Sequence, residues 1–167
     1  MLTYHLAMTA GKPASESHVE LVELVMPGDA NVLGTAFGGK IMQWTDLAAA
    51  LAAMRHARLP VVTASIDQLS FLAPVRIGHV AIFQAQVNAV FSTSMEVGVV
   101  VLTEDPGSGA RRKCCDAYLT FVALGPDGKP TAVPPIAAST EEERRRERDA
   151  RTRRESRLQL RTALRRG

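Results

Sequence analysis

Residues 26–55 read MPGDANVLGTAFGGKIMQWTDLAAALAAMR, and this stretch decides the fold. Its first part is rich in turn formers, which keep it out of helix and strand. A Gly38-Gly39 pair then leads into about sixteen residues without Gly or Pro, rich in Ala, Leu and Met, which predicts a helix. The only charges before its last residue are Lys40 and Asp46, so we expect a helix buried nearly all round. A buried carboxylate is costly unless it is paired or used, which makes Asp46 the first candidate functional residue.

Length and composition indicate one ordinary domain. The chain has 167 residues, of which 46% are hydrophobic. No N-terminal stretch has the pattern of a signal peptide, and the longest apolar run, residues 47–54, is far too short to span a membrane. The two cysteines, Cys114 and Cys115, are adjacent and suit neither a disulfide framework nor a metal site. These features predict a cytoplasmic protein without a membrane span.

The order of the remaining elements predicts the fold class. Stretches rich in β-branched residues predict strands, and turn signals separate several of them. The expected strands cover residues 18–25, 61–71, 79–91, 92–103 and 111–124. A run of strands after one helix indicates an α+β protein with an antiparallel sheet wrapped around that helix. Because one helix covers only one face, we expect a second copy of the chain to cover remaining apolar surface.

The last part of the chain is rich in arginine. Residues 140–167 hold 11 Arg and 6 Asp or Glu. Thr140 followed by Glu143 predicts a capping box at the start of a helix. The favourable i,i+4 pairs expected along this helix are Glu141/Arg145, Glu142/Arg146, Glu147/Arg151 and Asp149/Arg153. Interleaved acids and the lack of aromatic residues favour a solvated, self-paired helix over nucleic-acid or membrane binding.

Three stretches of the chain resemble a known family. PGDANVLGTAFGGKIMQWTD, VTASIDQLSFLAPVRIG and RRKCCDAYLTFVALGPDGKP are similar to the hotdog-fold acyl-CoA thioesterases, both the small bacterial acyl-CoA hydrolases and the cytosolic long-chain acyl-CoA hydrolases of animals. The resemblance covers roughly residues 19–134 in the right order. One departure is His79, which stands where the family's FLxPVxxGD segment usually has an acid.

The resemblance implies both a fold and an activity. The fold is an antiparallel sheet of five or six strands around one long central helix, here followed by the Arg-rich C-terminal helix. We therefore expect a flexible lead-in over residues 1–17, a hotdog domain over 18–136 and the Arg-rich helix over 137–167. The implied assembly is a homodimer with active sites at its interface, often extended to a hexameric trimer of dimers. The implied activity is hydrolysis of fatty acyl-CoA to fatty acid and CoA, with CoA as part of the substrate and no cofactor.

The resemblance also implies the catalytic residues. The family's carboxylate falls on Asp46, as general base or as nucleophile, and its asparagine falls on Asn31 of the partner subunit. The residues themselves add a donor site, because the backbone N–H groups of Gly38, Gly39 and Lys40 at the start of the helix are free to bind a thioester carbonyl oxygen.

Coenzyme A carries phosphates, so basic side chains should lie near the mouth of the site. The candidates are Thr93 and Ser94 in one hairpin and Arg111, Arg112 and Lys113 at the start of a strand; a solvated strand end is the alternative for these cations. The histidines have no partners at the spacing of metal ligands, so no metal site is expected.

Two other functions fit the same fold. One is a hotdog module that senses acyl-CoA without cleaving it, but nothing before residue 18 could form the DNA-binding segment typical of such regulators. The other is a hydratase or dehydratase. Those enzymes usually rely on a histidine, and the only one near residues 26–55 is His56, just past their end. The sequence therefore favours a thioester hydrolase.

Overall fold

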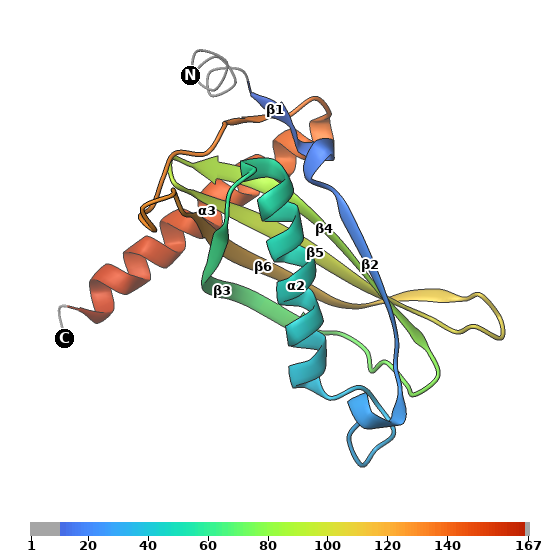
Figure 1. Ribbon diagram of the computed structural model, residues 1–167. Coiled ribbons are helices and arrows are strands. Elements are labelled where there is room, and N and C mark those ends of the chain that lie inside the picture. Colours follow the sequence, from blue (N-terminus) through green and yellow to red (C-terminus); the bar gives the residue numbers. More distant parts are fainter. Residues whose placement is uncertain (1–10, 166–167) are drawn as a thin grey trace.

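The protein is a five-stranded antiparallel sheet with one helix on each face, and the computed structural model describes residues 11–165 (Figure 1). The strands lie in the order β2-β4-β5-β6-β3. In chain order the elements are β1 (Lys12–Pro13), the 3-10 turn η1 (Ala14–Ser17), β2 (Val19–Leu24), the 3-10 turn η2 (Pro27–Asp29), α2 (Gly38–Ala57), β3 (Val61–Phe71), β4 (Val80–Phe91), β5 (Ser94–Glu104), β6 (Arg111–Ala123), β7 (Ile136–Ala137) and α3 (Glu141–Leu164). This architecture confirms the predicted α+β hotdog fold, and each expected strand is present within about two residues of its predicted bounds.

Helix α2 packs on the inner face of the sheet through small side chains. Ala48, Ala49, Ala52 and Ala53 are all fully buried, and they let the helix backbone approach the sheet closely. Trp44 fills the wider gap nearer the start of the helix, where its ring meets the edge of Phe83 with centroids 5.9 Å apart. The alanines that the sequence places along α2 therefore form the central seam of the core.

The prediction that α2 is buried nearly all round is wrong for the single chain. Met42, Leu47 and Met54 are 40%, 45% and 37% exposed, and Asp46 is half-buried on the same helix. The physical reason is that the sheet covers only one side of α2. The exposed apolar stripe of the helix remains available to another molecule.

Strand β3 forms one edge of the sheet and also carries exposed apolar side chains. It is 11 residues long and pairs only with β6, so the backbone groups along its outer side have no strand partner within the described chain. Val62, Ile66 and Phe71 are exposed on it. A long edge strand with exposed apolar side chains is a ready template for pairing with another strand.

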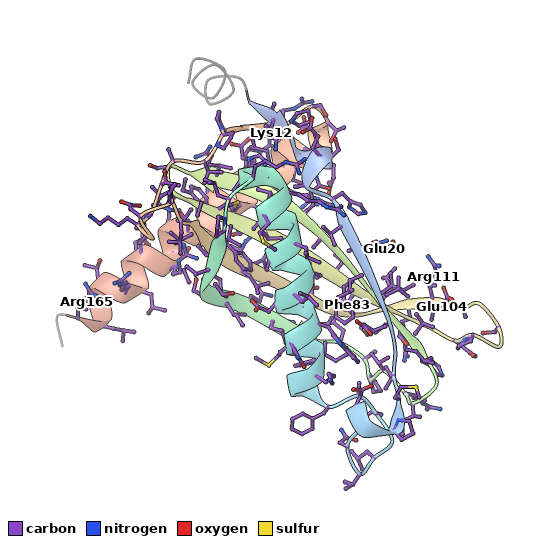
Figure 2. All side chains as sticks on the ribbon, in the orientation of Figure 1. Lys12, Glu20, Phe83, Glu104, Arg111 and Arg165 are labelled. Atoms are coloured by element: carbon purple, nitrogen blue, oxygen red, sulfur yellow. The ribbon has the colours of Figure 1, made fainter. Side chains whose placement is uncertain are left out.

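Residues 12–17 are folded onto the domain, which corrects part of the predicted lead-in; residues 1–10 lie outside the described residues. Strand β1 pairs in parallel with β7, and the Lys12 ammonium donates to the carbonyls of Arg55 (3.1 Å) and His56 (2.8 Å) at the end of α2 (Figure 2). A cation bound to the last carbonyls of a helix is favourable. Short polar segments of this kind carry no hydrophobic periodicity, so the sequence did not reveal them.

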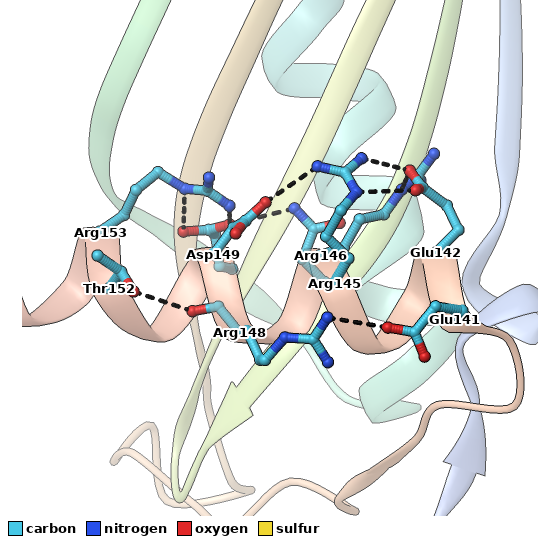
Figure 3. A network of polar contacts seen from close by, with 10 residues as sticks. Glu141, Glu142, Arg145, Arg146, Arg148, Asp149, Thr152 and Arg153 are labelled. Carbon is cyan, nitrogen blue, oxygen red and sulfur yellow. Dashed lines mark hydrogen bonds and ion pairs between the residues drawn. The ribbon is translucent and has the colours of Figure 1, made fainter.

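Helix α3 begins as predicted, with a capping box. Thr140 accepts from the N–H of Glu143 at 3.1 Å, and the Glu143 carboxylate accepts from the N–H of Thr140. Two predicted pairs are present: Glu142/Arg146, whose side chains Figure 3 shows, and Glu147/Arg151. The other two are wrong: Glu141 pairs with Arg144 and Arg148, and Asp149 pairs with Arg145.

The prediction of a solvated, self-paired α3 also fails on the side that faces the sheet. Arg153 binds both carboxylate oxygens of Glu96, at 2.7 and 3.1 Å, and lies 3.7 Å from the centre of the Tyr118 ring. One turn on, Arg157 binds Asp67 and Thr120. These contacts fix α3 on the outer face, opposite α2, as Figure 1 shows. Arg153 thus pairs with a carboxylate on a strand instead of its predicted partner Asp149, and the partner of Arg157 also lies on a strand.

None of the helices within residues 11–165 combines the length and apolar character that crossing a membrane requires.

Candidate functional site

Asp46 is held in place by a threonine from the neighbouring strand. The Thr63 hydroxyl on β3 donates to Asp46 Oδ1 at 2.7 Å. The carboxylate makes no other hydrogen bond within the described chain, which leaves Oδ2 open at the half-exposed side of α2. A carboxylate with one oxygen fixed and the other open can take a proton from water or attack a bound carbonyl carbon.

Thr63 is a site residue that sequence reasoning missed. It lies 17 residues after Asp46 on a different element, and it belongs to an alternating strand in which threonine is an ordinary residue. The contact arises because a short turn returns the chain from α2 into β3. No motif marks such a pair, so only the folded structure reveals it.

Asn31 organises the loop before α2. Its side-chain oxygen accepts from the N–H of Leu33 (2.9 Å) and from the hydroxyl of Thr35 (3.2 Å), while its own N–H donates to the Thr35 carbonyl (2.8 Å). Gly34 completes the turn at φ +73°, where other residues are strained. These donors occupy Oδ1, so the Nδ2 amide, which has no hydrogen-bond partner among the described residues, is the group that Asn31 can offer to a ligand.

The start of α2 supplies two free backbone donors rather than the three that were predicted. Within residues 11–165 the N–H groups of Gly38 and Gly39 have no acceptor. The N–H of Lys40 already donates to the Phe37 carbonyl at 2.9 Å, because the first turn of the helix is tight. The Lys40 ammonium pairs with Asp29 at 3.2 Å, so this residue braces the loop instead.

Asp46 and the donors of its own chain are too far apart to act on one thioester. Asp46 lies seven positions after Gly39 along α2, which corresponds to about 10 Å at the rise of an α-helix. The structure therefore places a carboxylate and a pair of free backbone donors at two separate points of the chain.

A cavity of about 210 Å³ opens beside the start of α2. Its lining is mainly apolar and includes Gly38, Ile41, Phe71, Cys114 and Cys115. Burial raises the pKa of each cysteine thiol to about 11, so both stay protonated at neutral pH. The two cysteines therefore line the cavity as small apolar groups and do not serve as nucleophiles.

The predicted CoA-contacting residues fall into two distant groups. Ser94 begins β5 and Thr93 directly precedes it, whereas Arg111 pairs with Glu104 at the opposite end of β5. At the rise of an antiparallel strand, Ser94 and Glu104 are roughly 34 Å apart. Lys113 forms an ion pair with Asp116. One chain therefore does not bring both groups to the same nucleotide.

His56 cannot supply the histidine of a hydratase. Its side chain is fully buried at the far end of α2, and Nε2 lies 2.8 Å from the Pro134 carbonyl oxygen. Burial lowers the pKa of the ring, which keeps it neutral. In the part of the chain that the structure describes, no cluster of three or more His, Cys, Asp or Glu has the arrangement of a metal site.

Comparison with known proteins identifies the family. A family model described as the thioesterase superfamily matches residues 33–110. The uncharacterized acyl-CoA thioester hydrolase YkhA of Bacillus subtilis is 41% identical over 128 residues, which cover 77% of this chain and 74% of the relative. The chain belongs to the thioesterase superfamily. The predicted resemblance to the acyl-CoA hydrolases is thereby confirmed.

Solved structures of thioesterases share the fold. A hexameric acyl-CoA thioesterase superposes with a TM-score of 0.87 and 39% identity, over 90% of this chain and 96% of that one. The acyl-CoA hydrolase of Staphylococcus aureus was solved with butyryl-CoA, CoA and CoA disulfide. It superposes with a TM-score of 0.87 and is 36% identical, over 94% of this chain and 96% of that one. Variants of that hydrolase replace an aspartate, a threonine or an asparagine by alanine. In sequence, that asparagine precedes the aspartate by 15 residues and that threonine follows it by 17, as Asn31 and Thr63 do around Asp46.

Proposed function

We propose that this thioesterase hydrolyses fatty acyl-CoA to a free fatty acid and CoA, with Asp46 as its catalytic carboxylate. The observation that carries the proposal is the 2.7 Å hydrogen bond from Thr63, which fixes Asp46 on the open side of α2. The matching spacing of the three substituted residues in the Staphylococcus aureus hydrolase supports it further. The reaction as proposed consumes only water and needs no cofactor, because CoA is part of the substrate. A cytoplasmic location also stays a prediction.

The geometry supports different roles for the carboxylate and for the hydrogen-bond donors. As general base, Asp46 takes a proton from the water that attacks the thioester carbonyl carbon; as nucleophile, its free Oδ2 attacks that carbon to give an anhydride, which water then hydrolyses. In either route the C–S bond breaks and the departing CoA thiolate takes up a proton. The N–H groups of Gly38 and Gly39 and the Asn31 amide are the donors for the oxygen on which negative charge develops.

The proposed active unit is a homodimer with one site at each end of its interface. The 10 Å between Asp46 and its own helix start requires donors from another chain. The exposed edge of β3 and the apolar stripe of α2 provide a surface for that chain. A two-fold axis would then bring Asn31 and Gly39 of each chain to Asp46 of the other. Three such dimers would form the hexamer that the resemblance implies.

The proposal is tested by following thiol release from acyl-CoAs from acetyl to palmitoyl. We expect Asp46→Asn to lower kcat/KM about 100- to 10,000-fold, because the amide can neither accept a proton from water nor attack the carbonyl. The variant should fold normally, since Asp46 is half-buried and its Thr63 hydrogen bond can be kept by an amide oxygen.

Thr63→Val is the matched variant, because it releases the carboxylate without removing it. A smaller loss of turnover than in Asp46→Asn would fit a positioning role for Thr63. Binding of the whole panel without any turnover by the wild type would instead favour an acyl-CoA sensor. Full activity of a folded Asp46→Asn protein would remove Asp46 from the mechanism.

A further inference from the structure

Asp29, the last residue of η2, contacts the chain on both sides of the Asn31 loop. Its carboxylate uses a different oxygen for each side: Oδ2 accepts from the N–H of Met26 at 3.1 Å, and Oδ1 lies 3.2 Å from the Lys40 ammonium. Its backbone carbonyl accepts from the N–H of Phe37 at 2.8 Å. Asp29 therefore ties the start of the loop to the first turn of α2, at the lower end of the molecule in Figure 1.

The Lys40 ammonium has a second contact, on its own helix. It lies 5.3 Å from the centre of the Trp44 ring, one turn further along α2, which is within the range of a cation–π interaction. Trp44 is 8% exposed and packs against Phe83 of β4. The ammonium thus links a carboxylate of the loop to a ring that is anchored in the core.

The ion pair between Asp29 and Lys40 is better shielded from water than an ordinary surface pair. The two side chains are 17% and 32% exposed. The attraction between two charges strengthens as protein replaces the surrounding water, whereas fully exposed pairs contribute little. Within residues 11–165 neither group has another ion-pair partner. Loss of one member therefore leaves the charge of the other uncompensated.

This pair spans the two sets of donors that the proposed reaction uses. Asn31, which offers its Nδ2 amide, follows Asp29 by two residues. Gly38 and Gly39, whose N–H groups have no acceptor in the described chain, directly precede Lys40. The hydrogen bonds of the Asn31 side chain stay within the loop, so they do not set its distance from α2. The contact of Asp29 with Lys40 does connect the loop to the helix.

Donors stabilise a developing oxyanion only if they are held in place before the charge appears. A displacement of about 1 Å can lower a rate about 100-fold. We propose that Asp29 and Lys40 are a positioning pair, which holds the Asn31 amide and the free N–H groups of α2 at the spacing that one thioester oxygen requires. The inference rests on the proposed function. Because the pair acts through the loop, its loss should lower kcat and leave KM nearly unchanged.

The test is steady-state hydrolysis of the best acyl-CoA of the acetyl-to-palmitoyl panel by the intact protein. We expect Lys40→Met to lower kcat about tenfold and to change KM less than about twofold, because methionine keeps an apolar stem but loses the charge. Asp29→Asn should have a similar effect, since its amide oxygen can still accept from the N–H of Met26. Lys40→Arg should keep more than about half of the wild-type kcat, because a guanidinium can contact both the carboxylate and the Trp44 ring. A kcat as low in Lys40→Arg as in Lys40→Met would overturn the role of the charge.

Arg151→Met is the matched control. Arg151 pairs with Glu147 at 2.6 Å and lies 5.7 Å from the centre of the Phe91 ring, so it makes the same two kinds of contact on the opposite face of the sheet. This variant should leave kcat and KM unchanged. An equal loss of kcat in Arg151→Met and Lys40→Met would mean that any lost ion pair slows the enzyme, and it would overturn the positioning role.

A double-mutant cycle shows whether Asp29 and Lys40 act together. If they act as one pair, the protein that carries both Asp29→Asn and Lys40→Met should have a kcat no lower than either single variant. Losses that multiply to about a hundredfold would show two independent effects and overturn the pair.

The same kinetics distinguish the failure of this inference from that of the proposed function. Wild-type turnover with an unchanged kcat in Lys40→Met would overturn the pair and leave the hydrolase. A raised KM with unchanged kcat would make Lys40 a substrate-binding residue and overturn its positioning role. If turnover survives in Asp46→Asn but falls in Lys40→Met, Asp46 leaves the mechanism and the pair stays. A wild type that cleaves none of the panel would overturn both.

Discussion

The two helices lie on opposite faces of one sheet and are held there by different forces. Helix α2 meets the inner face through buried alanines and the Trp44–Phe83 contact, with no ion pair to the sheet among the described residues. Helix α3 meets the outer face through Arg153–Glu96 and Arg157–Asp67. Apolar packing allows close approach and leaves the Asp46 carboxylate without an ion-pair partner among the described residues. Ion pairs fix α3 at particular points, and their strength depends on charge and pH.

The largest effect on stability should come from the inner face. Phe83 is fully buried on β4 against α2. We expect Phe83→Ala to lower the free energy of unfolding by about 3–5 kcal/mol, because it removes aromatic contacts and leaves a cavity in close-packed surroundings. Urea denaturation measures this change. A loss below about 1 kcal/mol would mean that the α2 face is not the centre of the core.

A substitution on the outer face should lower the stability less, because it leaves a single buried charge without its partner. Arg153→Ala leaves the Glu96 carboxylate, whose side chain is 3% exposed, with only the Asn88 amide at 3.1 Å. We expect a loss of about 2 kcal/mol, below the value for a fully buried pair because the arginine is 24% exposed. Arg145→Ala is the control on the same helix; its ion pairs are exposed, and we expect a much smaller loss of stability than for Arg153→Ala. Equal losses of stability in Arg153→Ala and Arg145→Ala would show that the buried ion pair contributes no more than the exposed ones.

The smallest effect on stability should come from Asp67, and it should depend on pH. Burial opposes ionisation of Asp67, but hydrogen bonds from Arg157, Ser65 and Thr120 outweigh it and lower its pKa below the ordinary 3.8. Ionised Asp67 therefore stabilises the folded protein at pH values above 3.8. This stabilisation is lost as the pH falls through the lower pKa that Asp67 has in the folded protein. We expect Asp67→Asn to cost about 1 kcal/mol at pH 6.

The control for this prediction is the pH series itself. Thermal melts of wild type and Asp67→Asn between pH 6 and pH 3 should show a gap in melting temperature that narrows only below about pH 3.8. A gap that stays constant, or that widens in acid, would show that ionised Asp67 does not help to hold α3.

The sequence predicted features that depend on local pattern. The helix after Gly38, the alternating strands and the capping box of Thr140 all follow from spacing along the chain, and each is present. The Thr63–Asp46 contact depends on which strand returns beside α2, and local pattern does not determine that. Glu96 and Asp67 look like ordinary solvent-facing strand residues until α3 covers them. The error about α2 has a related cause, because composition indicates that a face is buried but not which chain buries it.

The central claim is that each active site takes Asp46 from one chain and Asn31 from the other. Coexpressing Asn31→Ala and Asp46→Asn chains tests it most directly, since each variant alone should be nearly inactive. A shared site predicts that random pairing restores roughly a quarter of wild-type thioesterase activity, because half of the dimers are mixed and each mixed dimer holds one intact site of two. Activity no higher than the mean of the two single variants would contradict the account and place both residues of each site in one chain.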